Sequence, residues 1–338
     1  MSRRQAVTQV THGAFRAGVA RVYCEMKSAL VADPACLAHE TGLGHPESSR
    51  RFAAVSAALH AAGLVEKMQR LEPRAVGTAD LVLAHDPAYV ALAEREILSD
   101  ADQLSTGDTV ISPHSWDAAL KAVGSGLAAV DAVAGGKAMR AFCVVRPPGH
   151  HANASRGMGF CIFNNIAIAA RHAQRRHGIE RVLIVDWDVH HGNGTQDIFY
   201  EDGSVFFFST HQSPWYPGTG RADETGAAAG KGATLNCPLP AFSGRKEIFA
   251  CFEEKLVPAM EKFRPGLILI SAGFDSRKED PLGHFLLTDE DFADLTRIVA
   301  GIAVRHSGGR IVSMLEGGYH LSGLASAAVA HVTALIED

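Results

Sequence analysis

The chain has little of what nucleic-acid binding, membrane insertion or secretion requires. Its 32 lysine and arginine residues are outnumbered by 37 aspartate and glutamate residues, and the formal charge is −5. This balance argues against non-specific binding to nucleic acid or to an anionic membrane. No apolar run approaches the roughly 18 residues of a membrane-spanning helix. The charged N-terminus lacks the following apolar stretch of a secretory signal.

Cysteine is also scarce, with six residues among 338 and no C-x-x-C pair. This number does not indicate a disulfide scaffold in so long a chain. Cys24, Cys143 and Cys161 lie within apolar runs, where a free cysteine behaves as a small hydrophobic residue. The sequence therefore predicts a protein of a reducing compartment, and we expect it in the cytoplasm.

Short β-branched or aromatic runs alternate with amphipathic segments. This alternation predicts one α/β domain with a central, mainly parallel β-sheet flanked by helices on both faces. The expected strands are 21–25, 141–145, 181–186, 204–209, 266–271 and 310–315. The expected helices are 49–62, 113–135, 164–177, 246–262, 288–306 and a last one from about 321. Residues 1–20 are expected to form an arm before a domain of residues 21–338. The Gly-rich loop 212–232 is long enough to suggest a functional role, and with the arm it is where we expect substrate gating or the contacts of a homo-oligomer.

Polar clusters follow five of these predicted strands, at the carboxyl end in each case. The clusters are "RPPGHHANASRGMGF", "WDVHHGNGTQ", "THQSPWYPGTG", "AGFDSRKEDPLG" and "EGGYH". Ligands of open α/β sheets bind beyond the carboxyl ends of the strands. The sequence therefore predicts a single site at this edge of the sheet.

The stretch "VDWDVHHGNG" predicts a metal site. On extended backbone, residues two apart point the same way, so Asp188 and His190 can reach one ion, whereas His191 points away. Two ligands are too few, and Asp275, which follows the strand 266–271, is the expected third. Two carboxylates and one imidazole leave positions open for water and substrate, as in catalytic sites.

Two further groups have the chemistry that a hydrolytic metal site needs. His150 and His151 follow two prolines and a glycine, a rigid turn, and an imidazole titrates near neutral pH as a general base must. Asp186 and Asn193 are available as hydrogen-bond partners that set the tautomers of these rings. Tyr319, in "GGYH", could direct its hydroxyl at an oxyanion opposite the metal.

The motifs "RPPGHH", "GMGFCIFNN", "VDWDVHHGNGTQ", "PGTG", "SAGFDS…DPLG" and "EGGY", in this order, resemble the zinc-dependent histone deacetylase family, in its class II branch and bacterial relatives. The resemblance spans about residues 40–335. The family includes acetylpolyamine amidohydrolases and shares an arginase-like α/β fold.

The resemblance implies one zinc ion held by Asp188, His190 and Asp275. It implies His151 as general base and then acid, and His150 as its electrostatic partner held by Asp186. Tyr319 would polarise the scissile carbonyl. Asn193 stands where class I members have aspartate, which is a class II trait.

The resemblance also implies a tunnel for an acyl-lysine side chain. Phe160 and Tyr216 would form its walls, although position 216 usually holds phenylalanine, and the Gly159 carbonyl would accept the substrate amide N–H. Asp108 would bind substrate backbone at the rim.

Arg51 matches an arginine near an internal acetate-release pocket. The family's potassium sites match Asp186, Asp188, His190, Ser209 and Thr210 for one ion, and Phe199, Asp202 and Val205 for a second.

The substrate is expected to be an acyl-lysine peptide or protein, with a small acylated amine as the alternative. Members that act on polyamines carry a glutamate just after "DP", and here that position is Leu282, which offers no attraction to an internal ammonium. Two other classes of protein are alternatives. A non-catalytic acyl-lysine-binding module would lack a metal ligand, the base or the tyrosine. An arginase-type ureohydrolase would need ligands for two manganese ions.

Overall fold

The computed structural model describes residues 28–337 of the chain. The expected arm, 1–20, and the first expected strand, 21–25, lie outside the described residues. Within them, eight strands form one sheet in the order β2-β1-β3-β8-β7-β4-β5-β6, and every neighbouring pair is parallel. The strands are β1 (Ala29–Ala32), β2 (Gln69–Leu71), β3 (Arg140–Val144), β4 (Val182–Asp186), β5 (Val205–Gln212), β6 (Thr234–Leu239), β7 (Leu267–Ala272) and β8 (Ile311–Leu315).

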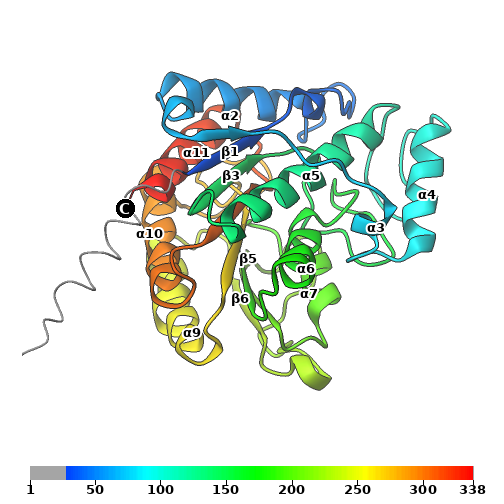
Figure 1. Ribbon diagram of the computed structural model, residues 1–338. Helices are drawn as coiled ribbons and strands as arrows, with labels where there is room; N and C mark the ends of the chain where they lie inside the picture. Colours follow the sequence, from blue (N-terminus) through cyan, green and yellow to red (C-terminus); the bar gives the residue numbers. More distant parts are fainter. Residues whose placement is uncertain (1–27, 338) are drawn as a thin grey trace, which may run out of the picture.

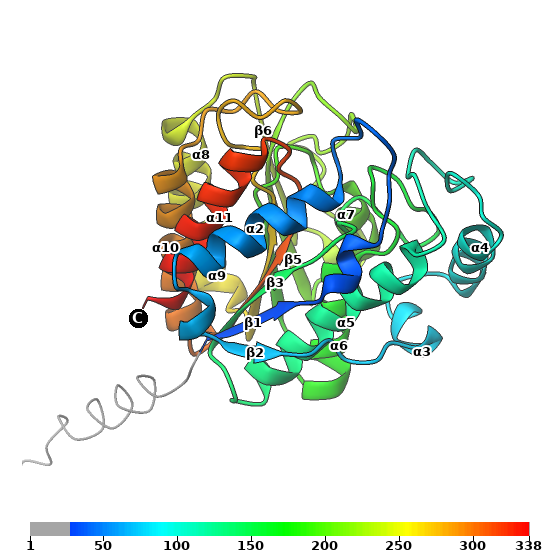
Figure 2. The same ribbon diagram turned by 90° about the horizontal axis from the view of Figure 1, so that it is seen from above.

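Helices cover both faces of the sheet, as predicted (Figures 1 and 2). On one face lie α5 (Ser115–Ala134) and α6 (Asn165–His177), with α7 (Asn193–Phe199) beside them. The other face is covered by α2 (Ser49–Ala61), α8 (Arg245–Ala250), α9 (Val257–Phe263), α10 (Asp289–His306) and α11 (Leu321–Ile336). Two further helices, α3 (Thr78–Leu81) and α4 (Pro87–Leu98), lie at the end of the molecule nearest α5 and α6. Because both faces are covered, the central strands are buried along their whole length, which explains their continuous apolar runs.

Five predicted strands are confirmed, and three others were missed. β5 continues to Gln212, three residues beyond the prediction, because its polar end pairs with β6. β1 and β2 have only four and three residues, too few for a clear pattern. β6 contains Pro238, which a strand tolerates only at the sheet edge where β6 lies.

Two predicted helices differ in detail. The helix expected from Ser112-Pro113 begins at Ser115, after a turn closed by the Ser115 N–H on Ser112 O at 2.8 Å, and the Ser112 hydroxyl accepts the backbone N–H of Glu40. The helix expected over 246–262 is α8 and α9 joined by a π-helical segment, Cys251–Leu256.

Candidate active site

The predicted polar loops meet at the carboxyl edge of the sheet around one cavity of about 230 Å³. Parallel pairing of all the strands brings their carboxyl ends to the same edge. The cavity is lined by Asp108, His151, Gly159, Phe160, His190, Trp215, Tyr216, Leu282 and Tyr319. Loops that are far apart in the chain thus supply one site.

Three predicted metal ligands, Asp188, His190 and Asp275, converge at this edge. The Nδ1 atom of His190 lies 3.0 Å from Asp188 Oδ1 and 3.2 Å from Asp275 Oδ2. Both aspartates are fully buried, and His190 is 8% exposed. The structure therefore brings the three donors together in a protected position.

Backbone N–H groups hold the two carboxylates in place. Asp188 accepts the N–H of His190 at 2.9 Å and of Gly317 at 2.8 Å, and Asp275 accepts the N–H of Val189 at 2.9 Å. Gly317 has to be a glycine, since a Cβ there would lie 2.0 Å from Asp275 Oδ2. The orientation of both acids is thus set by the main chain.

The donor set fits a divalent metal ion. Zinc binds nitrogen and carboxylate oxygen at about 2.0–2.2 Å, which places neighbouring ligand atoms roughly 3.0–3.6 Å apart. The observed separations of 3.0 and 3.2 Å fall in this range. Burial raises the pKa of Asp275 to about 7, and the like charge of Asp188 adds to this shift. A cation would offset the repulsion between two buried acids.

The two adjacent histidines differ in their partners. His150 Nδ1 lies 2.9 Å from Asp186 Oδ2, while His151 Nδ1 lies 2.8 Å from the amide oxygen of Asn193. Burial opposes the charged form of His150, but Asp186 and other nearby carboxylates raise its pKa well above the ordinary value. Burial lowers the pKa of His151 well below its ordinary value, and the charge of His150 lowers it further.

A neutral His151 must donate its Nδ1–H to Asn193, because the amide oxygen can only accept. Its Nε2 lone pair is therefore left for chemistry in the cavity that His151 lines. His191 makes other contacts: its Nδ1 lies 2.8 Å from Thr219 Oγ1 and its Nε2 lies 3.1 Å from Gln196 Oε1. Its ring nitrogens are thus unavailable to a second ion, which argues against the two-metal arrangement of a ureohydrolase.

Tyr319 completes the inner part of the cavity. Its backbone N–H donates to Asp280 at 2.7 Å, which fixes the turn that carries it. The guanidinium of Arg51 lies 5.0 Å from the centre of its ring. Burial raises the pKa of Tyr319 well above its usual range, so its hydroxyl keeps the proton and can donate it. Arg51 is itself fully buried and donates to Gly318 O at 2.6 Å and to Glu47 at 3.1 Å.

The outer part of the cavity is aromatic and apolar, formed by Phe160, Tyr216 and Leu282. Asp108 lies at this rim with both carboxylate oxygens engaged. Oδ1 accepts the N–H of Gly159 at 2.6 Å, and Oδ2 accepts the Tyr216 hydroxyl at 3.2 Å. The unusual hydroxyl at position 216 therefore ties two sides of the rim together.

The residues matched to the first potassium site lie at the end of β4 and within β5, and those matched to the second lie between the end of α7 and the start of β5. Asp186 is level with Ser209 in the pairing of these strands, and Asp186 Oδ1 accepts the N–H of Asp188 at 3.1 Å. In the second group, Asp202 accepts Ser204 Oγ at 2.6 Å and forms an ion pair with Arg171. An ion at this second position would therefore have to use main-chain oxygens.

Several residues of the site were not predicted. Trp215 lines the cavity and donates its indole N–H to Leu282 O at 2.8 Å. Glu316, buried behind His150, accepts the N–H groups of Gly149 at 2.7 Å and His150 at 3.2 Å. Its position directly after β8 is the sequence signal that could have identified it. Asp280 could not be identified in this way, because the turn that it holds lies 39 residues further along the chain.

Comparison with known proteins agrees with this geometry. Residues 45–335 match the histone deacetylase domain. The chain belongs to the histone deacetylase family. It is 40% identical over 278 residues to a histone deacetylase-like amidohydrolase of Pseudomonas aeruginosa, covering 82% of this chain and 73% of that protein. Its structure is similar to the HDA15 HD domain, with a TM-score of 0.87 and 34% identity, covering 92% of this chain and 88% of that one.

A second curated relative is the human polyamine deacetylase HDAC10, which is 39% identical over 335 residues. The match covers 95% of this chain but only 48% of that protein. The protein is thus a deacetylase, an enzyme of the hydrolase class. Its α/β fold is of the arginase/deacetylase type. The alternative of a non-catalytic acyl-lysine-binding module is therefore not supported. Among residues 28–337, no helix is both long and apolar enough to cross a membrane.

Proposed function

We propose that this deacetylase uses one zinc ion to hydrolyse the amide between an acyl group and the side-chain nitrogen of lysine in a peptide or protein. The proposal rests on the convergence of Asp188, His190 and Asp275 beside a cavity that His190 and His151 both line. These three residues would hold the ion and leave positions open for water and substrate. When bound, zinc supplies Lewis-acid chemistry that polarises a carbonyl and lowers the pKa of water towards about 7.

His151 acts first as base and then as acid. Its Nε2 takes the proton of the attacking water and later gives it to the leaving amine nitrogen. Asn193 maintains the tautomer that this requires, through the 2.8 Å contact to Nδ1. His150, held by Asp186, keeps a positive charge beside the position where negative charge develops.

Tyr319 donates its hydroxyl proton in a hydrogen bond to the carbonyl oxygen as that atom becomes an oxyanion. The buried phenol keeps its proton, so the donor is present throughout the neutral pH range. Arg51 and Phe160 position the ring: the guanidinium lies over it at 5.0 Å, and the Phe160 ring packs edge-on at 6.0 Å between ring centres.

The cavity favours a side chain that is apolar along its length. Phe160, Tyr216 and Leu282 give a lysine its methylene contacts, and the Gly159 carbonyl accepts the amide N–H. Leu282 offers no negative charge to the internal ammonium of a polyamine. Asp108 accepts substrate backbone N–H groups with the lone pairs that Gly159 and Tyr216 leave free.

An acetylpolyamine is the second candidate substrate, favoured by the name of the human relative, a polyamine deacetylase. A comparison of kcat/KM for acetyl-lysine peptides, longer acyl-lysine peptides, N-acetylspermidine and N-acetylputrescine separates the two. We expect the acyl-lysine peptides to be the better substrates. If an acetylpolyamine is better by orders of magnitude, the assignment from Leu282 is wrong.

Potassium is proposed beside the end of β4 and the middle of β5, with Asp186, Asp188, His190, Ser209 and Thr210 supplying one site. Support comes from the alignment of Asp186 with Ser209 in the strand pair. Phe199, Asp202 and Val205 would supply main-chain oxygens to a second. Assembly into a homo-oligomer and a cytoplasmic location stay predictions.

A further inference from the structure

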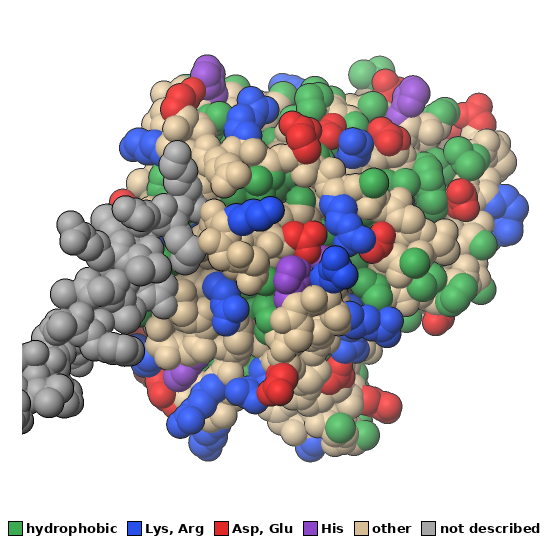
Figure 3. Space-filling model, viewed as in Figure 1, with side chains coloured by type: hydrophobic (Ala, Val, Ile, Leu, Met, Phe, Trp, Pro, Cys, Tyr) green, Lys and Arg blue, Asp and Glu red, His purple; other side chains and the backbone are tan. Residues whose placement is uncertain are grey.

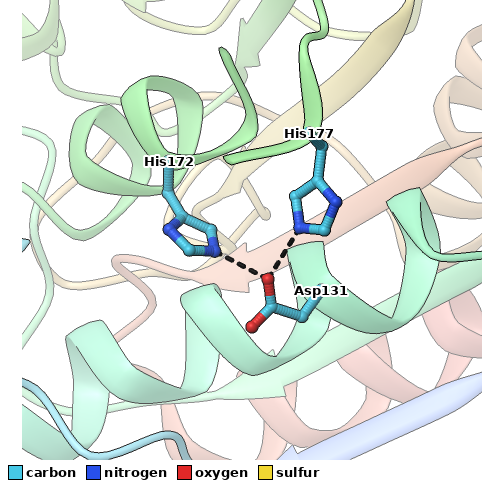
Figure 4. A group of neighbouring side chains, drawn as sticks. All are labelled: Asp131, His172 and His177. Atoms are coloured by element: carbon cyan, nitrogen blue, oxygen red, sulfur yellow. Dashed lines mark hydrogen bonds and ion pairs between the residues drawn. The ribbon is translucent and has the colours of Figure 1, made fainter. Parts of the chain in front are cut away.

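A second cluster of metal-binding side chains lies outside the catalytic cavity, between α5 and α6. Asp131 of α5 faces His172 of α6 and His177, the last residue of α6 (Figure 4). Both imidazoles direct Nε2 at the same carboxylate oxygen, Asp131 Oδ1, each at 2.7 Å. Within residues 28–337, this and the catalytic cluster are the two groups of at least three such side chains close enough to share an ion.

The three donor atoms are nearly in position for one ion. All lie within 4.8 Å of one another, and the 2.7 Å separations need to widen by only a few tenths of an ångström to reach the roughly 3.0–3.6 Å of a zinc-type site. The side chains of Asp131 and His177 are 40% and 21% exposed, so an ion and its water ligands can reach them. Asp131 and His172 also line a surface cavity of about 440 Å³.

We propose that Asp131, His172 and His177 bind one divalent ion of the zinc, cobalt and nickel class and clamp the carboxyl end of α6 to α5. Two imidazoles and a single carboxylate favour these ions over magnesium or calcium, which prefer sets of oxygen ligands. The function of this site is separate from catalysis, because none of the three residues lines the catalytic cavity.

The surroundings limit the affinity of this site. Basic and acidic side chains gather on the face that carries α5 and α6, with a histidine between them (Figure 3). Arg74, Arg175 and Arg176 line the same cavity as Asp131. Arg74 Nη1 lies 3.4 Å from His172 Nδ1, the atom that carries the proton when Nε2 binds a metal. Arg74 must therefore turn away on metal binding, towards Asp80, which is already 3.3 Å from its Nη2.

Because Arg74 competes with the metal for His172, some variants should abolish zinc binding and one should strengthen it. Zinc is titrated into the full chain whose catalytic site already holds its metal, and heat of binding and Tm are measured. We expect one further equivalent to bind, with a Tm increase on the order of 5 °C at roughly 100-fold excess over Kd. His177→Gln and Asp131→Asn remove this equivalent, whereas Arg74→Gln, which replaces the competing donor and charge, tightens binding about tenfold.

His60→Gln is the matched control. His60 also faces a carboxylate, with Nδ1 3.0 Å from Glu66 Oε1, but the pair has no third donor in the described chain. We expect this variant to bind the second equivalent of zinc as the wild-type protein does. The proposal fails if the metal-loaded wild-type protein binds no further zinc, or if the further equivalent persists in both His177→Gln and Asp131→Asn. In either case the cluster is only a hydrogen-bonded triad.

Discussion

The catalytic cluster and the Asp131 cluster use the same side chains in opposite surroundings. Asp188 and Asp275 are fully buried and held by backbone N–H groups from three positions. Asp131 is half-exposed, and the hydrogen bonds that the described residues give its carboxylate come from the two imidazoles. One site is oriented by backbone N–H groups before an ion arrives, and the other is held by contacts between its own side chains.

This difference has an energetic consequence. Two buried carboxylates repel each other across a short distance, so a cation relieves a strain that the fold has already imposed. At the exposed cluster water screens the charges, and the imidazoles already satisfy the carboxylate. Metal binding is therefore expected to be strong at the catalytic cluster and moderate at the Asp131 cluster.

The largest expected effect comes from breaking the catalytic cluster. Asp275→Asn removes one charge and one ligand, and several kcal/mol of transition-state stabilisation with them, so kcat/KM should fall by more than about 10³-fold. Asp131→Asn makes the same chemical change at the other cluster and should leave kcat/KM unchanged. Steady-state deacetylation and zinc content per chain report both results, and equal losses in the two variants would contradict the account.

Tyr319→Phe tests the hydroxyl that is proposed to donate to the oxyanion in the cavity that Tyr319 and His190 line. Loss of one preorganised oxyanion donor costs about 10²–10³-fold in kcat. Tyr200→Phe, at the end of α7, is the control and should retain full activity. Zinc content should stay at the wild-type value in both variants. A Tyr319→Phe enzyme that kept most of its kcat would disprove the role of the hydroxyl.

Asn193→Asp should move the acid limb of the pH profile. Burial now holds the pKa of His151 low, and a carboxylate at Nδ1 would favour the imidazolium and raise that pKa. A base must be neutral to accept a proton. As the pH is lowered, the variant should therefore lose activity at a higher pH than the wild-type enzyme does. The profile of kcat/KM against pH measures this, and a limb that stayed in place or moved to lower pH would show that His151 is not the titrating base.

The smallest expected effect is at the rim. Tyr216→Phe removes the hydroxyl that holds Asp108 at 3.2 Å, a contact worth about 0.5–1.5 kcal/mol. We expect KM for an acetyl-lysine peptide to change by about 2–10-fold with kcat nearly constant, because the hydroxyl acts on the rim and not on the reacting atoms. A large loss of kcat would instead place Tyr216 in the chemistry.

Local sequence patterns were sufficient to predict which side chains of one short segment lie together. The spacing of Asp188 and His190 at the end of a strand predicted two ligands on one side, and the structure places both against Asp275. The continuous apolar runs of β3, β4, β7 and β8 predicted a sheet buried on both faces, and this is confirmed.

Contacts between distant segments could not be predicted in this way. The hydroxyl of Tyr216 reaches Asp108 across 108 residues, and His172 reaches Asp131 across 41. None of these residues has a local sequence pattern that points to its partner, and His172 is buried although its partner Asp131 is 40% exposed. The edge strands β2 and β6 were missed for a related reason, because pairing with a neighbour, and not their own pattern, makes them strands.

Reconstitution of the metal-free enzyme with zinc shows whether one ion at Asp188, His190 and Asp275 is sufficient for deacetylation. Deacetylation of an acetyl-lysine peptide and Tm are followed as zinc is added in fractions of an equivalent. We expect activity to rise linearly to a plateau at one equivalent per chain, and the second equivalent to raise Tm without changing kcat. Full activity without zinc, or activity that continued to rise to two equivalents, would contradict this expectation.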